Sequence, residues 1–311
     1  MKRLHKKILW AAAIGFILMN VVAFFHAYKF THFADAAKAR TKSPEKLSTG
    51  EKLTALVFGV NNPRPENKII PAHPYQTVYL QSSKKIECWE IKKDSGANGT
   101  VVIFHGYSGS KSTMLDKADE FLKLNYHVLL VDFIGSGGSE GNQTTLGVKE
   151  AQDVRACYNY LNEKGEKNII LFGTSMGAVS ILKAIDEYKI TPSKIILECP
   201  FGTMYETTVA RFQNMSAPSF PMAGLLVFWG GVQNGFWAFS HKPVTYANSV
   251  VCPVLLLYGE KDANVSRKEI HAIYKNLKGV KQLKTYPEAG HENYLLKYKE
   301  EWIRDVSQFL L

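Results

Sequence analysis

The sequence predicts an α/β fold with a mostly parallel sheet, preceded by an N-terminal segment that spans a membrane. Two patterns favour the fold: short apolar runs alternate with helical patterns from residue 77 onward, and a glycine-flanked serine lies where one run meets a helix. The absence of charge from residues 8–25 predicts the membrane segment. We therefore divide the chain into a basic tail at 1–7, this segment, a connector at 26–70 and a main domain at 71–311.

The membrane segment Ile8–Phe25 is near the lower length limit for a helix that crosses a bilayer. It is also longer than the apolar part of a typical signal peptide, so we expect an uncleaved single-pass anchor. A cleaved signal is the alternative, and Ala34-Asp35-Ala36 is a cleavage-like site that lies well downstream.

Basic residues flank the membrane segment in nearly equal number on its two sides. They are Lys2, Arg3, Lys6 and Lys7 before it, and Lys29, Lys38, Arg40 and Lys42 after it. The positive-inside rule therefore gives little preference by itself. Because a very short basic tail normally stays in the cytoplasm, we expect the main domain on the extracytoplasmic side.

The connector contains one short amphipathic helix. Ser48-Thr49-Gly50-Glu51 matches a capping box, and apolar residues then recur at helical spacing until Asn61-Asn62-Pro63 ends the pattern. We expect the apolar stripe to pack on the main domain, with the membrane surface as the alternative. The stripe consists of Leu53, Leu56, Val57 and Val60.

The main domain shows eight strand-like runs. A short turn joins the first two as in an antiparallel hairpin, and helical patterns separate most of the others, which is typical of a mostly parallel sheet flanked by helices. The runs are Thr77–Leu80, Lys85–Ile91, Thr100–Phe104, His127–Asp132, Ile169–Phe172, Lys194–Glu198, Val254–Tyr258 and Leu283–Tyr286.

The serine lies in Gly173-Thr174-Ser175-Met176-Gly177, between a strand-like run and a helical pattern. A serine held in a strained turn needs neighbours without Cβ atoms, so that strand and helix can pass close together. The N–H of Met176 would then start a helix, where it can meet a developing oxyanion. This context predicts a nucleophile, whereas a bare G-x-S-x-G also occurs in turns without chemistry.

Other informative residues follow the ends of predicted strands, where ligands bind in such sheets. His105-Gly106-Tyr107 follows one strand, and the Tyr107 N–H can complete an oxyanion hole with that of Met176. His105 itself is expected to brace the loop. Asp262 and His291 follow two later strands, and the chain order Ser, Asp, His is that of one lineage of catalytic triads. Glu198, at the end of another strand, is a less favoured rival to Asp262.

From about Thr77 onward the chain resembles the α/β-hydrolase superfamily, and in particular its monoglyceride-lipase-like and serine-aminopeptidase-like group. The motifs that carry the resemblance are His105-Gly106, Asp132-x-x-Gly135-x-Gly137-Gly138-Ser139, the Ser175 pentapeptide, Gly259-x-x-Asp262 and Gly290-His291. The resemblance implies the α/β-hydrolase fold. It also implies that Ser175 is the nucleophile, that His291 moves the proton and that Asp262 orients His291.

The resemblance calls for no metal and no organic cofactor. It makes the glycine-rich segment 135–141 structural, with Asp132 as its brace, and this segment lacks the Lys-Ser/Thr pair of a phosphate-binding loop. The four cysteines are far apart and lack metal-ligand spacing, so buried thiols are expected, although an exported domain could hold a disulfide.

A lid is expected at about 201–248, between two strands, where this superfamily carries one. Its many large apolar side chains pack on one another in part, and we expect some of them to line a passage for an acyl chain. The candidates are Leu225, Leu226, Phe228 and Trp229. The substrate is then a small-molecule ester with an apolar or lipid-like acyl group, cleaved through an acyl-enzyme.

Other functions use the same residues or the same composition. An amidase, a peptidase or an acyltransferase would use the same triad, and a membrane-tethered binding protein could keep the fold without catalysis. The complete triad argues against the last of these. The net charge of +10 could suggest nucleic acid, but the lysines are scattered and no basic-aromatic RNA signature occurs, so no nucleic-acid partner is expected.

Overall fold

The structure, a computed structural model, describes residues 2–35, 38–42, 47–94 and 96–311. The chain forms two compact units. Unit 1 consists of Met1–Pro63 and Met204–His241, and unit 2 of Arg64–Thr203 and Lys242–Leu311. Ala36 of the cleavage-like site lies outside the described residues.

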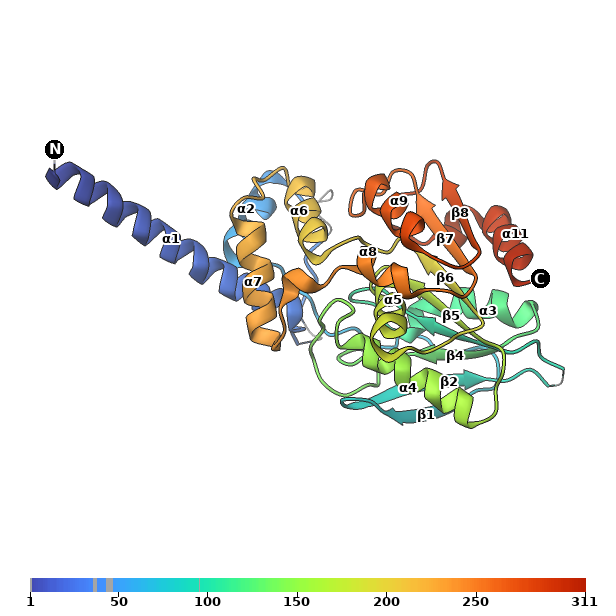
Figure 1. The fold of residues 1–311 in the computed structure, drawn as a ribbon. Helices are drawn as coiled ribbons and strands as arrows, with labels where there is room; N and C mark the ends of the chain where they lie inside the picture. Colours follow the sequence, from blue (N-terminus) through green and yellow to red (C-terminus); the bar gives the residue numbers. More distant parts are fainter. Residues whose placement is uncertain (1, 36–37, 43–46, 95) are drawn as a thin grey trace. The chain divides into compact units, whose positions relative to one another are not determined.

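Unit 2 is built on one eight-stranded sheet with the strand order β1-β2-β4-β3-β5-β6-β7-β8 (Figure 1). β1 pairs antiparallel with β2, and β2 pairs antiparallel with β4, whereas all other neighbours are parallel. The predicted hairpin and the mostly parallel sheet are therefore confirmed. The strands are β1 (Gln76–Gln81), β2 (Lys85–Ile91), β3 (Thr100–Phe104), β4 (His127–Val131), β5 (Ile169–Thr174), β6 (Lys194–Glu198), β7 (Val254–Gly259) and β8 (Lys281–Tyr286).

The central strands are apolar on both faces because helices cover both sides of the sheet. Along β3, Val101 and Ile103 belong to a core shared with the helices α3 and α11, while Val102 points to the opposite face. The helices α4 and α5 pack on each other and on β5. The helices of unit 2 are η2 (Lys111–Met114), α3 (Leu115–Lys123), α4 (Glu150–Glu163), α5 (Met176–Tyr188), α8 (Pro243–Tyr246), η4 (Ala247–Ser249), α9 (Arg267–Asn276), α10 (Tyr294–Lys297) and α11 (Lys299–Leu310).

Unit 1 is entirely helical in its regular elements. It contains α1 (Lys2–Thr31), α2 (Thr49–Phe58), α6 (Met204–Asn214), α7 (Met222–Asn234) and η3 (Ala238–Ser240). Most of the expected lid, Met204–His241, therefore groups with the N-terminal segment, and α7 packs against both α1 and α6. By length and composition, the part of α1 from Arg3 to Thr31 is able to cross a membrane.

The connector helix is present as α2, and its capping box is confirmed. The Ser48 side chain accepts a hydrogen bond from the Glu51 N–H, and the Glu51 side chain accepts one from the Ser48 N–H. The expected burial of its stripe is wrong, however, because Leu53 is 64% exposed and Val57 is exposed as well. Ala55 is the only buried residue of α2. The periodic pattern therefore predicted the helix correctly but not the burial of its apolar side chains.

Candidate active site

The turn between β5 and α5 holds Ser175 in a strained backbone conformation. Its φ of 53° and ψ of −110° are unusual for a residue with a side chain. A Cβ atom at Gly177 would lie 2.4 Å from the carbonyl oxygen of Phe104, and one at Gly173 would lie 2.5 Å from the Ala178 nitrogen. Both glycines are thus required by close backbone approach, as the sequence predicted, and the turn presents the Ser175 hydroxyl at the carboxyl ends of the strands.

Two loops bring His291 and Asp262 to that hydroxyl. Nε2 of His291 lies 3.0 Å from Ser175 Oγ, and Nδ1 of His291 lies 2.7 Å from Asp262 Oδ2. The three side chains therefore form one continuous hydrogen-bonded chain. In this arrangement Nδ1 carries the proton towards the carboxylate, which leaves Nε2 free to accept the serine proton.

The loop after β7 holds the Asp262 carboxylate in place. Its second oxygen, Oδ1, accepts the backbone N–H groups of Asn264 at 2.8 Å and Val265 at 2.9 Å. The loop passes so close to that of His291 that a Cβ at Gly259 would lie 2.6 Å from the Ala289 carbonyl oxygen. The side chain of Asp262 is fully buried. These contacts aim its other oxygen at His291.

Glu198, the rival acid, is occupied elsewhere. Its carboxylate accepts hydrogen bonds from the Trp302 indole at 2.7 Å and the Thr174 hydroxyl at 2.8 Å, and Lys117 Nζ lies 3.7 Å away. The group is fully buried. We interpret this carboxylate as structural, because a buried carboxylate whose two oxygens accept hydrogen bonds from Trp302 and Thr174 is satisfied by the core.

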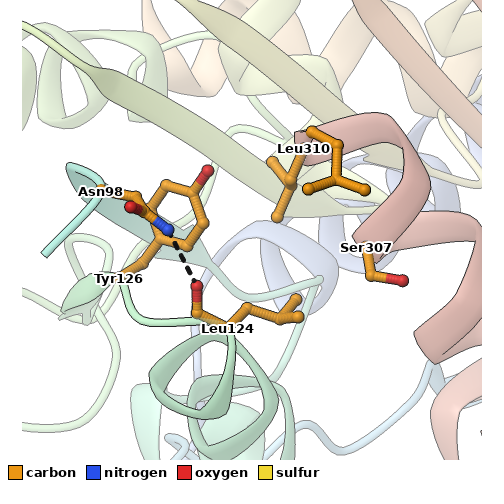
Figure 2. Close-up of a pocket in the computed structure, with 6 residues that line it drawn as sticks. Asn98, Leu124, Tyr126, Ser307 and Leu310 are labelled. Carbon is orange, nitrogen blue, oxygen red and sulfur yellow. Dashed lines mark hydrogen bonds between the residues drawn. The ribbon is translucent and has the colours of Figure 1, made fainter.

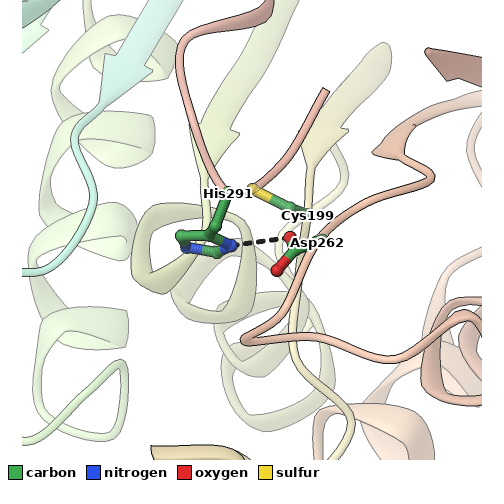
Figure 3. Close-up of side chains that lie close together, drawn as sticks. All are labelled: Cys199, Asp262 and His291. Carbon is green, nitrogen blue, oxygen red and sulfur yellow. Dashed lines mark hydrogen bonds and ion pairs between the residues drawn. The ribbon is translucent and has the colours of Figure 1, made fainter. Parts of the chain in front are cut away.

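Cys199 is a neighbour of the triad that the sequence reasoning missed as part of the site. It follows β6 directly, is buried, and has a positive φ of 40°. Figure 3 shows its sulfur beside the paired side chains of His291 and Asp262. The sequence signal for its role is its place at the carboxyl end of a parallel strand. The sequence instead predicts only a buried thiol at this position.

The neighbours of His291 determine its charge. Burial lowers the pKa of this imidazole, but the Cys199 sulfur and the Asp262 carboxylate together outweigh burial and raise the pKa well above its usual range. About a quarter of the His291 side chain remains exposed. A raised pKa makes the imidazole a stronger base but keeps it protonated until the pH exceeds that value, so His291 can accept the serine proton only above it.

Cys199, Asp262 and His291 are also the residue types that bind zinc, and their ligand atoms all lie within 4.8 Å of one another. Two ligands of a tetrahedral zinc ion are about 3.3 Å apart, given metal–ligand distances of about 2 Å. The His291 and Asp262 atoms are only 2.7 Å apart and share a proton. Their geometry fits a hydrogen bond better than a metal site.

The expected oxyanion donors occupy suitable positions along the chain. Met176 is the first residue of α5, where the N–H groups have no partner within the helix. Tyr107 lies in the turn after β3. His105 braces that turn: its Nε2 accepts the Phe133 N–H at 3.2 Å, which leaves Nδ1 to donate to the Gly106 carbonyl at 2.8 Å. Burial lowers the pKa of His105, so this residue stays neutral and structural.

Asp132 holds the glycine-rich segment, as the resemblance implied. Its Oδ2 accepts the Gly138 N–H at 2.8 Å, and its Oδ1 accepts the Lys111 N–H at 2.7 Å. The ammonium group of Lys111 is buried between Asp132 and Glu87. The segment is therefore a structural loop tied to a buried ion-pair network.

The four expected lid residues lie on α7 within unit 1. Leu225 and Leu226 are half-buried, and Phe228 is slightly more exposed. Trp229 packs against α1: its ring meets that of Phe24 edge to face at 5.3 Å, and its indole N–H donates to Asn20 Oδ1 at 3.1 Å. Trp229 thus has a partner in the N-terminal helix, which sequence reasoning did not anticipate.

A shallow pocket lies away from these groups. It is lined by Asn98, Leu124, Tyr126, Ser307, Leu310 and Leu311, as Figure 2 shows for five of them. Asn98 and Tyr126 come just before β3 and β4, so the pocket lies at the amino ends of the strands. Ser175 lies at the opposite, carboxyl ends. This pocket is not part of the candidate active site.

Known proteins resemble the chain in sequence. A protein family described as "Serine aminopeptidase, S33" matches residues 95–229. The uncharacterized protein YqkD of Bacillus subtilis is 25% identical over 215 residues, which cover 68% of this chain and 70% of that protein. Lysophosphatidylserine lipase ABHD12 of Danio rerio is 26% identical over 202 residues, or 60% of this chain and 50% of that protein. The match spans only half of that lipase.

Solved structures resemble the chain over most of its length. The Pyrococcus furiosus esterase Pf2001 superposes with a TM-score of 0.67 and 26% sequence identity, over 80% of this chain and 96% of the esterase. The protein therefore has the α/β-hydrolase fold, and its sequence is similar to the serine aminopeptidase S33 family, to this esterase and to a lysophosphatidylserine lipase.

Proposed function

We propose that this protein is a membrane-anchored serine hydrolase that cleaves carboxylic esters through an acyl-enzyme. The observation that carries the proposal is the hydrogen-bonded chain from Ser175 Oγ through His291 to Asp262. A serine beside a histidine that is oriented by a carboxylate is the arrangement that activates a hydroxyl as a nucleophile.

In the proposed reaction, Ser175 Oγ attacks the ester carbonyl while Nε2 of His291 takes the serine proton. Asp262 keeps the imidazole oriented and stabilises the imidazolium that forms. The N–H groups of Tyr107 and Met176 receive the negative oxygen of the tetrahedral intermediate. His291 then gives its proton to the departing alcohol, and water repeats the sequence to release the acid.

The substrate class is argued from the lid and from the relatives. The stretch 212–240 has no acidic, lysine or arginine residue, and it supplies the apolar side chains of α7. Relatives are named an esterase and a lysophosphatidylserine lipase. Both points favour an ester with an apolar acyl group.

Anchoring is part of the proposal. The helix α1 is long and apolar enough to span a bilayer. We propose that it remains attached as a signal-anchor and that unit 2 acts on the extracytoplasmic side, since short basic tails normally stay in the cytoplasm.

A fluorophosphonate probe tests the catalytic proposal in the full-length protein. We expect labelling of the wild type at Ser175, none of Ser175→Ala, and strongly reduced labelling of His291→Ala. Ser180→Ala is a matched control and is expected to keep the labelling. Ser180 is a buried serine of α5 whose hydroxyl donates a hydrogen bond to the Met176 carbonyl. Equal labelling of wild type and Ser175→Ala would refute the proposed nucleophile.

A peptidase is the second candidate, because the matching family is described as a serine aminopeptidase. Matched aryl esters, anilides and thioesters with the same acyl group separate the two. Ester cleavage is expected to be the fastest by a wide margin. Faster cleavage of aminoacyl anilides with a free amino group would instead favour the peptidase.

A further inference from the structure

The insertion between β6 and β7 contains a second long stretch without charge. Arg211 and Lys242 bracket it, and between them only His241 is ionisable. The helix in this stretch, α7, has 13 residues, so it is about 20 Å long at 1.5 Å per residue. That length is too short to cross a hydrocarbon layer of about 30 Å.

The helix α7 is joined to α1 by two hydrogen bonds. Trp229 donates to the Asn20 side chain at 3.1 Å, and Gln233 Nε2 donates to the Phe24 carbonyl at 2.8 Å. Asn20 is the most polar residue of the charge-free run that ends at Phe25. An amide inside a bilayer needs a partner, and the Trp229 indole supplies one.

The positions of these contacts along α1 define a depth. Asn20 precedes Phe25 by five residues, which places its contact with Trp229 about 8 Å inside the apolar run. The guanidinium of Arg211 lies 4.4 Å from the ring centre of Phe30, which is five residues beyond the run. Arg211 therefore meets α1 outside the apolar run, whereas Trp229 and Gln233 meet it inside the run.

Large apolar side chains of the same uncharged stretch are exposed. Phe220 is 83% exposed, Trp237 is 59% exposed and Val232 is 52% exposed. The Trp237 ring also contacts those of Phe228 and Phe239. Tryptophan is enriched where a membrane meets water, because its ring is apolar and its N–H is polar.

The end of α2 is fastened to the same part of α1. Lys29 Nζ donates to the Phe58 carbonyl at 2.7 Å, and Nε2 of His26 lies 3.2 Å from the Val57 carbonyl. Both contacts fall just beyond Phe25. The exposed residues Leu53, Val57 and Phe58 thus lie on an element that joins α1 at the edge of its apolar run.

We propose that the insertion is embedded in the interfacial layer of the phospholipid bilayer beside α1, with Phe220, Val232 and Trp237 in contact with lipid. The bilayer is the occupant because this apolar surface is continuous with the helix that enters the membrane. Embedding to a depth of about 5–10 Å is typical of helices that lie in the membrane interface. The inference rests on the anchoring proposed above, and not on hydrolysis.

Spin-label accessibility in nanodiscs tests this inference on the full-length protein. Single cysteines replace Phe220, Val232 or Trp237 in a Cys252→Ser background, since the other three native cysteines are buried. Val280→Cys is the control, because Val280 is an exposed apolar residue like the three test positions, is 74% exposed and lies in unit 2. Each protein carries a nitroxide and is placed in a disc of phosphatidylcholine and phosphatidylglycerol.

For each label we measure the ratio of its collision rate with oxygen to its collision rate with a water-soluble nickel chelate. We expect this ratio to be at least threefold higher for the three insertion labels than for the control label, because oxygen concentrates in lipid. Equal ratios at all four positions would overturn the proposal. Spin–spin broadening in discs that hold two copies, lost in discs that hold one, would also overturn it, since a second copy would then cover the surface. Adding Ser175→Ala to each protein keeps the ratios unchanged, so failure of embedding and failure of the hydrolase proposal are read separately.

Discussion

At the scale of single residues, the candidate site depends on which carboxylate faces His291. Asp262 lies 2.7 Å from its Nδ1, whereas Glu198 is enclosed by Trp302, Thr174 and Lys117. Both carboxylates lie at the carboxyl ends of parallel strands, so placement at a strand end alone does not distinguish them. Their partners do.

Asp262→Asn is expected to lower kcat for ester hydrolysis by about 10³–10⁴, because the amide favours the wrong tautomer of His291. Glu198→Gln is the matched control. It weakens contacts in the core and is expected to lower the melting temperature while kcat falls less than tenfold. Steady-state kinetics and thermal unfolding of both variants provide the comparison. A large loss of kcat in Glu198→Gln, together with near-normal kcat in Asp262→Asn, would contradict the assignment.

The acid limb of the pH–rate profile is expected above the ordinary histidine range. His291 must be neutral to accept the serine proton, and its pKa is raised well above 6.5 by Cys199 and Asp262 against the effect of burial. The value of kcat/KM is therefore expected to fall about tenfold per pH unit below that pKa. Cys199→Ala removes one of the two raising groups and is expected to move the limb to lower pH, with the high-pH plateau retained. An unmoved limb would show that the sulfur has no such effect.

Asp153, on α4, is expected to make the protein less stable as the pH rises. Burial raises the pKa of this carboxyl from 3.8 to about 8, although its Oδ2 accepts the Ile134 N–H at 3.1 Å. The folded protein thus holds the proton more tightly than the unfolded chain does. The contribution of the protonated Asp153 to the free energy of unfolding is fully present below about pH 4. It is lost as the pH rises towards 8, by up to about 1.4 kcal/mol per pH unit. Melting curves of wild type and Asp153→Asn from pH 5 to 8 measure it. The variant is expected to depend less on pH, and parallel curves would contradict the assignment.

At the scale of elements, α7 carries the four side chains that we propose for the acyl passage, and one of them already has a partner on α1. Trp229, Leu225 and Leu226 are all half-buried, and the Trp229 ring packs on Phe24. Our proposal that α7 residues line an acyl passage therefore applies foremost to the two leucines.

The specificity constant on aryl esters is expected to rise with acyl length and then level off. Each methylene that becomes buried contributes up to about 0.8 kcal/mol, or about a factor of four. Leu225→Ala and Leu226→Ala are expected to weaken long esters more than acetate, since only long chains reach that wall. Trp229→Ala and Phe228→Ala serve for comparison. If Trp229→Ala acts through the packing on α1, it lowers the specificity constant by the same factor for every acyl length. A steady decline from acetate onward would contradict the lipid-like substrate.

At the scale of the whole molecule, the two units differ in how completely their apolar side chains are covered. Unit 2 is a sheet domain with a core covered on both faces, while unit 1 leaves large apolar side chains exposed along α1, α2 and α7. Exposed apolar surface of this extent is unusual for a protein surrounded by water alone. The proposed anchor accounts for it.

The anchor and its orientation make a prediction of their own. The mature protein is expected to begin at or near Met1 and to stay with membranes in alkaline carbonate. A reporter fused after Leu311 is expected to behave as exported. An intact mass that corresponds to a start near Ala37 would identify a cleaved signal, and a cytoplasmic reporter would reverse the orientation. The reporter fused after Phe25 of a truncated chain tests the segment itself.

The sequence by itself determined the local chemistry of this protein. The pentapeptide around Ser175, the eight strands and the capping box at Ser48 depend on residues a few positions apart, and the structure contains each of them. Steric limits on the backbone and the hydrogen bonds of helix ends act over this range. For that reason, short patterns predict them well.

Only the tertiary structure decided which distant groups meet. The pairing of Trp229 with Asn20, the place of Cys199 beside His291 and the enclosure of Glu198 by Trp302 each join residues that are far apart in the chain. The exposure of Leu53 shows the same limit, because an apolar stripe does not specify what covers it. These contacts follow from how whole helices and strands pack, and a local pattern carries no information on the partner.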